Sequence, residues 1–313
     1  MKYAAVIAAA GLSSRMREFK PILCLGENTM IESVIHNLRE ANVDEIVVVT
    51  GYKSDILRRH LKPLDVRVCE NLHFAETKMF ESLCWGLRAV EKPYDAVFLT
   101  PGDVPLVQPE TIRKMHCADA GVVRPVCGER LGHPVLLKSD IVGKVLQYSG
   151  RNGLQGAIDS LNEPVFDLKV DDKGVVMDAD TPEDFKALHR LKMNQRSSGR
   201  LWSDIHIHIA KGDTILTPET AQFLEMIDHT GSIQSACACV HISYTRGWKL
   251  LNQIERELGY PLVARFPGGA SGGGSRLTDK GKQLLDAYQR YRDAVRETAE
   301  TLFAKIFTED LHG

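Results

Sequence analysis

The sequence predicts an α/β protein in which a doubly wound, mostly parallel, Rossmann-like sheet is followed by a second, mainly α-helical domain. Three observations predict this class. Short apolar segments alternate with amphipathic helical segments over the first part of the chain. A polar stretch then interrupts the pattern, and the sequence beyond it is mostly helical in character. A length of 313 residues also agrees with about two domains.

The predicted strands of the first domain are short, apolar and bounded by glycine, proline or charged residues. They are Tyr3–Ala9, Glu45–Thr50 and Ala96–Thr100. Helical patterns lie between them, for example over Met30–Ala41 and Met79–Val90. Because strands and helices alternate, we expect a mostly parallel sheet that is covered on both faces.

Residues 194–200 are polar and unpatterned, and they predict a linker between a first domain, 1–193, and a second domain, 201–313. The second domain opens with a predicted strand, Ile205–Ile209. On this strand the isoleucines would face inward, and His206 and His208 would face outward, so a metal site there is not expected.

The composition is that of a globular protein, with a net charge of −2, 26% charged residues and 43% hydrophobic residues. It excludes a disordered or collagen-like chain. The longest apolar run, Ala4–Ala10, is too short to cross a bilayer and lacks the pattern of a signal peptide, so no membrane association is expected. The seven scattered cysteines, without a Cys-x-x-Cys pair, indicate reduced thiols and a cytoplasmic protein. The thiols of Cys237 and Cys239 would diverge on a helix.

The first predicted strand runs into a turn of small residues that ends at Gly11, followed by Arg15 and Lys20. Small residues allow backbone N–H groups to approach an anion closely, and the two cations can neutralise phosphates from the side. The segment is neither a P-loop nor a dinucleotide-binding fingerprint. The alternative interpretation is a tight turn with a solvated arginine and lysine.

Asp103 follows the predicted strand Ala96–Thr100 closely. Ligands of doubly wound sheets bind at the carboxyl ends of the strands. A carboxylate at that edge is a natural ligand for Mg²⁺, which bridges the oxygens of a triphosphate.

A second acidic stretch, Asp178–Asp184, precedes a predicted helix. A plain helix N-cap at Thr181, with Pro182 in the first turn, explains the end of this stretch. It leaves Asp178 and Asp180 unexplained.

These motifs resemble the MobA-like nucleotidyltransferases, and most closely the MocA-like branch of molybdenum cofactor cytidylyltransferases, over about residues 1–192. The matching motifs are Ala9–Lys20, Leu25-Gly26, Gly51-Tyr52, Glu81-Ser82-Leu83 with Gly86, Gly102–Pro105, Gly132-His133-Pro134 and Asp178–Asp184.

The resemblance implies transfer of a nucleotidyl group from a nucleoside triphosphate to a phosphate-bearing, molybdopterin-type acceptor, with release of pyrophosphate. Such a displacement depends mainly on positioning and charge neutralisation. The resemblance assigns catalysis to Lys20, Arg15 and Asp103, Mg²⁺ binding to Asp103, Asp180 and Asp178, nucleotide binding to Ala9, Ala10, Gly11, Ser13, Gly51 and Ser82, and an acceptor contact to His133. His133 taken alone is more often a loop histidine, and Ser82 a helix-start residue.

The sequence Ala9-Ala10-Gly11 favours CTP, because the guanylyl members of the family usually carry Ala-Gly-Gly there. One departure from the family is Arg17, which stands where the family has glycine. If that glycine adopts a positive φ, Arg17 strains the loop, by about 1–2 kcal/mol. Arg17 could instead add a phosphate contact.

The second domain contains a helix-turn-helix pattern. A short helix of small residues, Ser232–Val240, is followed by a turn, by Ser243 as an N-cap and by a helix over Tyr244–Leu258. Trp248, Leu251, Ile254 and Leu258 of this helix repeat every three or four residues and form one apolar face.

Two apolar segments, Leu262–Phe266 and Ser275–Thr278, flank a glycine-rich tip and predict a hairpin that would lie along phosphates. A long amphipathic helix, Thr278–Phe307, follows. Residues 244–282 hold seven lysines and arginines against three acids, as a nucleic-acid face requires. The alternative is a small helical packing domain with a flexible glycine loop.

Residues 201–305 resemble the winged-helix domain of the ModE-like, molybdate-responsive regulators within the LysR-type group. The matching residues include Thr217-Pro218, Thr230–Ile233, Ser243-Tyr244, Trp248, Gly259–Val263, Gly272–Gly274, Leu277-Thr278 and Gly281. The resemblance implies a homodimer that binds double-stranded DNA through Ser243, Tyr244, Thr245, Arg246, Lys249, Arg265 and Arg276.

The sequence therefore indicates a Mg²⁺-dependent nucleotidyltransferase, using CTP and a molybdopterin acceptor, joined to a winged helix-turn-helix domain. Two alternatives stay open. The protein could be a transcriptional regulator of molybdenum metabolism whose transferase-like domain senses a nucleotide or a pterin. It could also be a guanylyltransferase, or a transferase that acts on another phosphorylated acceptor.

Overall fold

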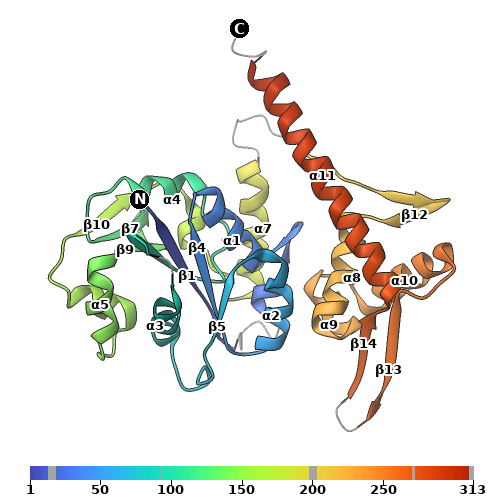
Figure 1. Ribbon diagram of the computed structural model, residues 1–313, viewed down its shortest axis with the longest axis horizontal. Helices are drawn as coiled ribbons and strands as arrows, with labels where there is room; N and C mark the ends of the chain where they lie inside the picture. The colour runs from blue at the N-terminus through green and yellow to red at the C-terminus, as the bar shows by residue number, and fades with distance from the viewer. Residues whose placement is uncertain (13–18, 92, 197–202, 270–271, 310–313) are drawn as a thin grey trace. The chain divides into compact units, whose positions relative to one another are not determined.

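The computed structural model describes residues 1–12, 19–91, 93–196, 203–269 and 272–309 (Figure 1). The chain divides into two compact units, Met1–Lys192 and Met193–Gly313. Three residues of the predicted phosphate-binding loop, Ser13, Arg15 and Arg17, lie outside the described residues.

The described residues of the first unit form an eight-stranded sheet in the order β10-β7-β9-β6-β1-β4-β5, with β8 paired to β7. Strand β1 is parallel to both of its neighbours, β4 and β6, and β9 is antiparallel to both of its own, β6 and β7. The prediction of a mostly parallel sheet is confirmed. The strands are β1 Tyr3–Ala9, β4 Glu45–Thr50, β5 Arg67–Glu70, β6 Ala96–Pro101, β7 Val122–Cys127, β8 Arg130–Leu131, β9 Val135–Lys138 and β10 Val165–Lys169, and a separate short pair is β2 Cys24–Leu25 with β3 Asn28–Thr29.

Helices cover both faces of this sheet (Figure 1). Residues of α3, α5 and α6 share one hydrophobic core with the buried residues of β1, β4 and β6. The helices of the first unit are α1 Met30–Glu40, α2 Ser54–Leu61, α3 Met79–Ala89, α4 Pro109–His116, α5 Ser139–Gln147, α6 Gly153–Asp159 and α7 Pro182–Arg196, with 3₁₀ turns η1 Lys20–Ile22, η2 Lys62–Leu64 and η3 Lys173–Val176.

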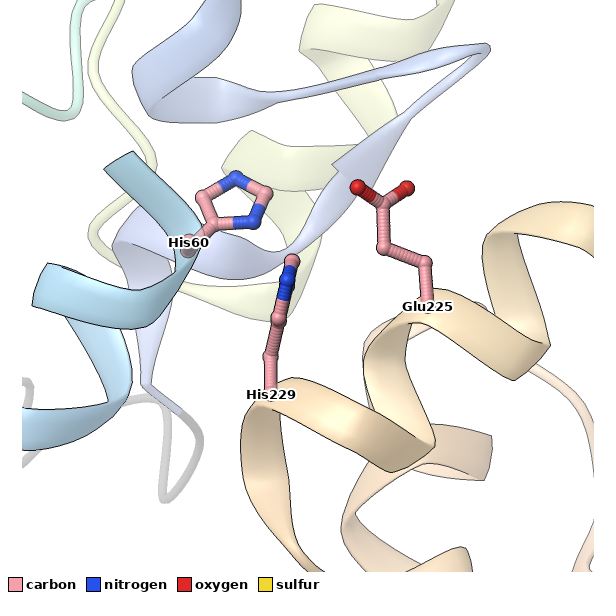
Figure 2. Close-up of side chains that lie close together, drawn as sticks. All are labelled: His60, Glu225 and His229. Atoms are coloured by element: carbon pink, nitrogen blue, oxygen red, sulfur yellow. The ribbon is translucent and has the colours of Figure 1, made fainter. Parts of the chain in front are cut away.

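The central strand β1 is buried and lies directly under α3. Gly86 of α3 permits this close approach, because a Cβ atom there would lie 2.2 Å from Cγ1 of Val6 and 2.7 Å from Cγ2 of Val49. The close packing places the start of α3 beside the carboxyl end of β1. On α2, the Nε2 atom of His60 (Figure 2) lies 2.8 Å from Oγ1 of Thr29, the residue that caps α1.

Helix α7 ends the first unit and begins at the predicted cap. The Oγ1 atom of Thr181 accepts the Asp184 N–H (3.2 Å), and the Asp184 carboxylate accepts the Thr181 N–H (2.9 Å). The predicted linker needs a correction, because α7 continues to Arg196 and residues 194–196 are helical. After Pro182 in its first turn, the helix has no glycine or proline up to Arg196 that would end it earlier. Residues 197–200 lie outside the described part of the chain.

The second unit is mainly helical, as predicted. Its elements are β11 Ile209–Lys211, β12 Asp213–Leu216, α8 Pro218–Thr230, α9 Ile233–Cys239, α10 Tyr244–Leu258, β13 Val263–Gly269, β14 Gly272–Leu277 and α11 Asp279–Glu309. Glu225 and His229 lie one helical turn apart on α8 (Figure 2). In the described residues, no helix is both long enough and apolar enough to cross a membrane.

The strand predicted over Ile205–Ile209 is wrong in its extent, because only Ile209 belongs to β11. Strand β11 instead runs forward into a tight turn at Gly212, whose φ is 82°, and pairs with β12. Strand β12 has only four residues, and its register ends at the pair Ile209–Leu216, so the paired strand begins at Ile209. His206 and His208 are exposed, as predicted.

Three of the helices in this unit begin at hydroxyl caps. Thr217, Ser232 and Ser243 each accept a backbone N–H at the start of α8, α9 and α10. Helices α9 and α10 pack closely at Gly247, where a Cβ atom would lie 2.4 Å from Sγ of Cys237. A four-residue connection therefore joins two tightly packed helices, as the helix-turn-helix pattern predicts.

The hairpin β13–β14 is attached to both flanking helices. One carboxylate oxygen of Glu255, on α10, accepts the N–H groups of Leu262 (2.7 Å) and Val263 (3.1 Å). The Ser275 N–H of β14 donates to the Gly231 carbonyl, which ends α8 (2.8 Å). These contacts fix the base of the hairpin relative to α8 and α10.

Candidate active site

A cleft of about 200 Å³ lies at the carboxyl ends of β1 and β6, next to the start of α3. Parallel sheets bind their ligands at this edge. Its walls are formed by Ala8, Ala9, Ala10, Gly11, Lys20, Pro21, Phe74, Thr77, Lys78, Met79, Ser82, Pro101, Gly102 and Asp103.

Lys20 is a buried cation of this cleft, only 8% exposed. Its Nζ lies 2.8 Å from Oδ1 of Asp180 and 3.3 Å from Oδ2 of Asp103. The lysine opens η1, whereas Asp103 follows β6 and Asp180 immediately precedes the cap of α7. The fold thus brings together three of the predicted site residues from distant parts of the chain.

Asp178 completes an acidic cluster with Asp103 and Asp180. Burial, and then the negative charges of the other two carboxylates, raises the pKa of Asp178 above its ordinary value. A divalent cation would offset the negative charges of these neighbouring carboxylates, and carboxylate oxygens are the ligands that Mg²⁺ prefers. Asp103 and Asp180 both contact Lys20, so these two carboxylates are the ones placed to hold such an ion together.

His133 lies in the same electrostatic environment. Its backbone N–H donates to the Val175 carbonyl (2.8 Å), and its Nδ1 is buried and has no hydrogen-bond partner among the described residues. Burial lowers the pKa of His133, which the nearby charge of Asp178 partly opposes. His133 is not among the residues that line the cleft.

The turn after β1 supplies the backbone wall. Ala9, Ala10 and Gly11 line the cleft. Gly51 lies behind them, since a Cβ atom there would be 2.6 Å from Cβ of Phe74 and 2.8 Å from the Ala10 carbonyl. The predicted contacts of Ser13 and Arg15 fall outside the described part of the chain.

The opposite wall, from the loop after β5 to the first turn of α3, includes residues that the sequence analysis did not identify. Phe74, Thr77 and Met79 line the cleft there, next to the predicted Ser82. Behind them lies Asn71, which is fully buried. The sequence analysis did not predict the strand β5, which Asn71 directly follows, so it gave no signal for this residue.

The residues predicted to contact DNA belong to the second unit. Ser243 caps α10, and Tyr244, Thr245, Arg246 and Lys249 of this helix are exposed. Arg265 of β13 and Arg276 of β14 are exposed as well. The guanidinium of Arg265 lies 4.0 Å from the centre of the Trp248 ring, so the hairpin and α10 present their side chains on one continuous surface.

The comparison with known proteins identifies the first unit. Residues 5–165 match the model of the MobA-like NTP transferase domain. The chain belongs to this family. The molybdenum cofactor cytidylyltransferase of Escherichia coli K12 is 27% identical over 182 residues, which are 58% of this chain and 92% of that enzyme. A nucleotidyl transferase from Methanothermobacter thermautotrophicus superposes with a TM-score of 0.55 at 25% identity, covering 62% of this chain and 99% of that one.

The C-terminal part is similar to a different class of protein. The molybdenum transport protein ModE of Azotobacter vinelandii is 33% identical over 93 residues, which are 28% of this chain. The match spans about a third of ModE, 34% of its length. The MobA-like chain is therefore a nucleotidyltransferase-family protein joined to a ModE-like part.

Proposed function

We propose that this MobA-like protein is a Mg²⁺-dependent nucleotidyltransferase that transfers the cytidylyl group of CTP to a molybdopterin-type acceptor and releases pyrophosphate. The observation that carries the proposal is the buried Lys20, which is paired with Asp103 and Asp180 at the cleft where a doubly wound sheet binds its ligand. The relative named as a molybdenum cofactor cytidylyltransferase, and the Ala9-Ala10-Gly11 turn, support CTP and the acceptor.

The reaction is an in-line displacement at the α-phosphorus of the nucleotide. An oxygen of the acceptor phosphate forms the new P–O bond, the bond to the β-phosphate oxygen breaks, and pyrophosphate leaves with the electron pair. Lys20, together with Arg15, would hold the triphosphate, and the N–H groups of Ala10 and Gly11 would face its oxygens. Asp103, Asp178 and Asp180 would hold Mg²⁺, which when bound neutralises the charge of the phosphate oxygens.

The remaining predicted residues would contact either the nucleotide or the molybdopterin-type acceptor. Ser82 and Ala9, with Ser13, belong to the nucleotide, and Gly51 supports the turn on which the nucleotide lies. His133, whose Nδ1 has no hydrogen-bond partner among the described residues, would contact the acceptor.

A turnover assay with the full-length protein tests this function. CTP, GTP or ATP is supplied with Mg²⁺ and molybdopterin, and pyrophosphate release and the mass of the product are measured. We expect turnover with CTP, its loss in Asp103→Asn, and unchanged turnover in Asp171→Asn, which removes an exposed carboxylate outside the cleft. Turnover with GTP alone would make the protein a guanylyltransferase, and turnover in Asp103→Asn would reject the role of Asp103.

The second unit supports a further function, binding of double-stranded DNA as a winged helix-turn-helix in a homodimer. The exposed side chains of α10 and the arginines of the hairpin favour this function, as does the similarity to ModE. Selection from a random duplex library, followed by a titration at several salt concentrations, tests it. A defined two-part site with a steep salt dependence is expected, and weak binding without sequence preference would reject a regulatory role.

A further inference from the structure

Asn71, to which no role has been assigned so far, lies at the centre of a hydrogen-bond network behind one wall of the cleft. It directly follows β5, and its backbone N–H donates to the Thr50 carbonyl (2.8 Å). The fully buried side chain contacts the His73 N–H and the hydroxyl groups of Thr77 and Ser82. Both hydroxyl-bearing residues line the cleft.

The network fixes the orientation of the Asn71 amide. The backbone N–H of His73 can only donate, and it lies 2.9 Å from Oδ1 of Asn71. Nδ2 therefore faces the two hydroxyls, at 2.8 Å from Oγ1 of Thr77 and 3.1 Å from Oγ of Ser82. Each N–H of the amide is donated to one hydroxyl oxygen.

The two hydroxyl groups differ in what they do with their own hydrogen. Thr77 donates its hydrogen to the His73 carbonyl (2.9 Å). The hydroxyl hydrogen of Ser82 has no acceptor among the residues that the structure describes. A serine hydroxyl has one hydrogen and two acceptor lone pairs. Asn71 occupies one lone pair, and the hydrogen is left to donate to a molecule in the cleft.

We infer that Asn71 is a positioning residue that holds Ser82 as a hydrogen-bond donor to the nucleotide base. The inference rests on the proposed function. Ser82 shares its wall with Phe74 and Met79, whose apolar side chains suit a flat base. The cation of Lys20 suits phosphates instead. The O2 and N3 atoms of cytosine are acceptors and match a hydroxyl donor.

A double-mutant cycle tests this role. The dissociation constants of CTP and of tripolyphosphate, which lacks a base, are measured in Mg²⁺ by calorimetry for the wild-type chain, Asn71→Asp, Ser82→Ala and the double variant. A carboxylate at position 71 only accepts, so it would take the hydroxyl hydrogen of Ser82 away from the base. Tripolyphosphate reports any change in the phosphate subsite, including the effect of the added negative charge.

We expect Asn71→Asp and Ser82→Ala each to raise the ratio of the CTP dissociation constant to the tripolyphosphate dissociation constant about ten-fold. This factor corresponds to the loss of one hydrogen bond. The double variant should show no larger ratio than either single variant, because all three lack the same bond. Asn71→Ala, which introduces no charge, should raise the ratio about three-fold, and this effect should vanish in the Ser82→Ala background.

The inference would be overturned if the ratio of the two dissociation constants stayed unchanged in Asn71→Asp and Asn71→Ala. It would also be overturned if the double variant raised this ratio about a hundred-fold, as two independent ten-fold effects would do. Either result would leave the proposed function intact. If Asn71→Asp does not fold, the test rests on Asn71→Ala in the wild-type background and in the Ser82→Ala background. A wild-type chain that binds neither ligand would reject the proposed function, and the inference with it.

Discussion

Lys20 and Asp180 stand 160 positions apart in the chain, yet Nζ of the lysine lies 2.8 Å from Oδ1 of the aspartate. The lysine is almost completely buried, and the carboxylates beside it compensate its charge. The phosphate oxygens of a triphosphate would supply the same negative charge beside Lys20. The ion pair thus holds the cation at the cleft, where the proposed triphosphate would meet it.

Replacing Lys20 by methionine should therefore lower turnover by at least about 100-fold, since an electrostatic contact of this kind contributes about 3–4 kcal/mol to the transition state. Lys20→Arg keeps the charge and should recover part of the loss. Steady-state kinetics with CTP measures both. Equal turnover in Lys20→Met and the wild type would remove Lys20 from the mechanism.

Packing between α3 and β1 gives a second prediction. Gly86→Ala places a Cβ atom 2.2 Å from Cγ1 of Val6 and should destabilise the fold by about 1–3 kcal/mol. Gly143→Ala on α5 is the matched control, because a Cβ atom there meets nothing within 4 Å. It should be neutral or stabilise the fold by up to about 1 kcal/mol. Urea unfolding measures both, and a stable Gly86→Ala protein would contradict the close contact.

The stability of the first unit should depend on pH through His116. Burial, with the charges of Arg113 and the N-terminus, lowers the pKa of His116 from 6.5 to about 4. Between about pH 6.5 and pH 4 the unfolded chain therefore binds a proton at this residue that the native state does not bind, and stability decreases as the pH falls. Above pH 6.5 the residue is neutral in both states and contributes no pH dependence.

His116→Phe should make this decrease smaller. The ring stacks on Tyr3 at 3.7 Å, and a phenylalanine can keep that stack. The buried Nε2 has no hydrogen-bond partner in the described chain, so the substitution loses no bond there. Urea unfolding at pH 7 and pH 5 gives the measurement, and an equal decrease in variant and wild type would assign the pH dependence to other groups.

DNA binding should be separable from catalysis. Arg246→Ala removes an exposed cation from α10 and is expected to weaken binding to the selected duplex at least ten-fold, with unchanged turnover of CTP. Arg290→Ala, which removes an exposed arginine from α11, is the control and should change neither property. Loss of both functions in Arg246→Ala would reject the modular account.

Local features of the fold could be predicted because each is encoded within a few residues. The apolar runs of β1 and β4 end at charged residues or glycine, and both strands have the predicted bounds. Helix α10 has its predicted bounds because Ser243 caps its start and Gly259, at a φ of 79°, ends it. The cap at Thr181 was likewise readable from four residues.

The features that were predicted wrongly, or were not predicted, depend on contacts between residues that are distant in the sequence. The strand expected at Ile205 begins at Ile209, since its partner β12 is short. The pairing of Lys20 with two aspartates, 83 and 160 positions away, follows only from the order of strands in the sheet. The role of Asn71 could not be predicted, because its partners Thr77 and Ser82 are common residue types and nothing in the sequence links them to Asn71.

The measurement that tests the central claim most directly is a thermal-shift titration of the full chain with CTP and GTP, with and without Mg²⁺. A ligand at about 100 times its Kd stabilises the native state by about 2.7 kcal/mol, which raises the transition by several degrees. A shift with CTP that requires Mg²⁺, and that Asp103→Asn abolishes, is the predicted result. No shift with either nucleotide would contradict the account of the cleft as a working nucleotidyltransferase site.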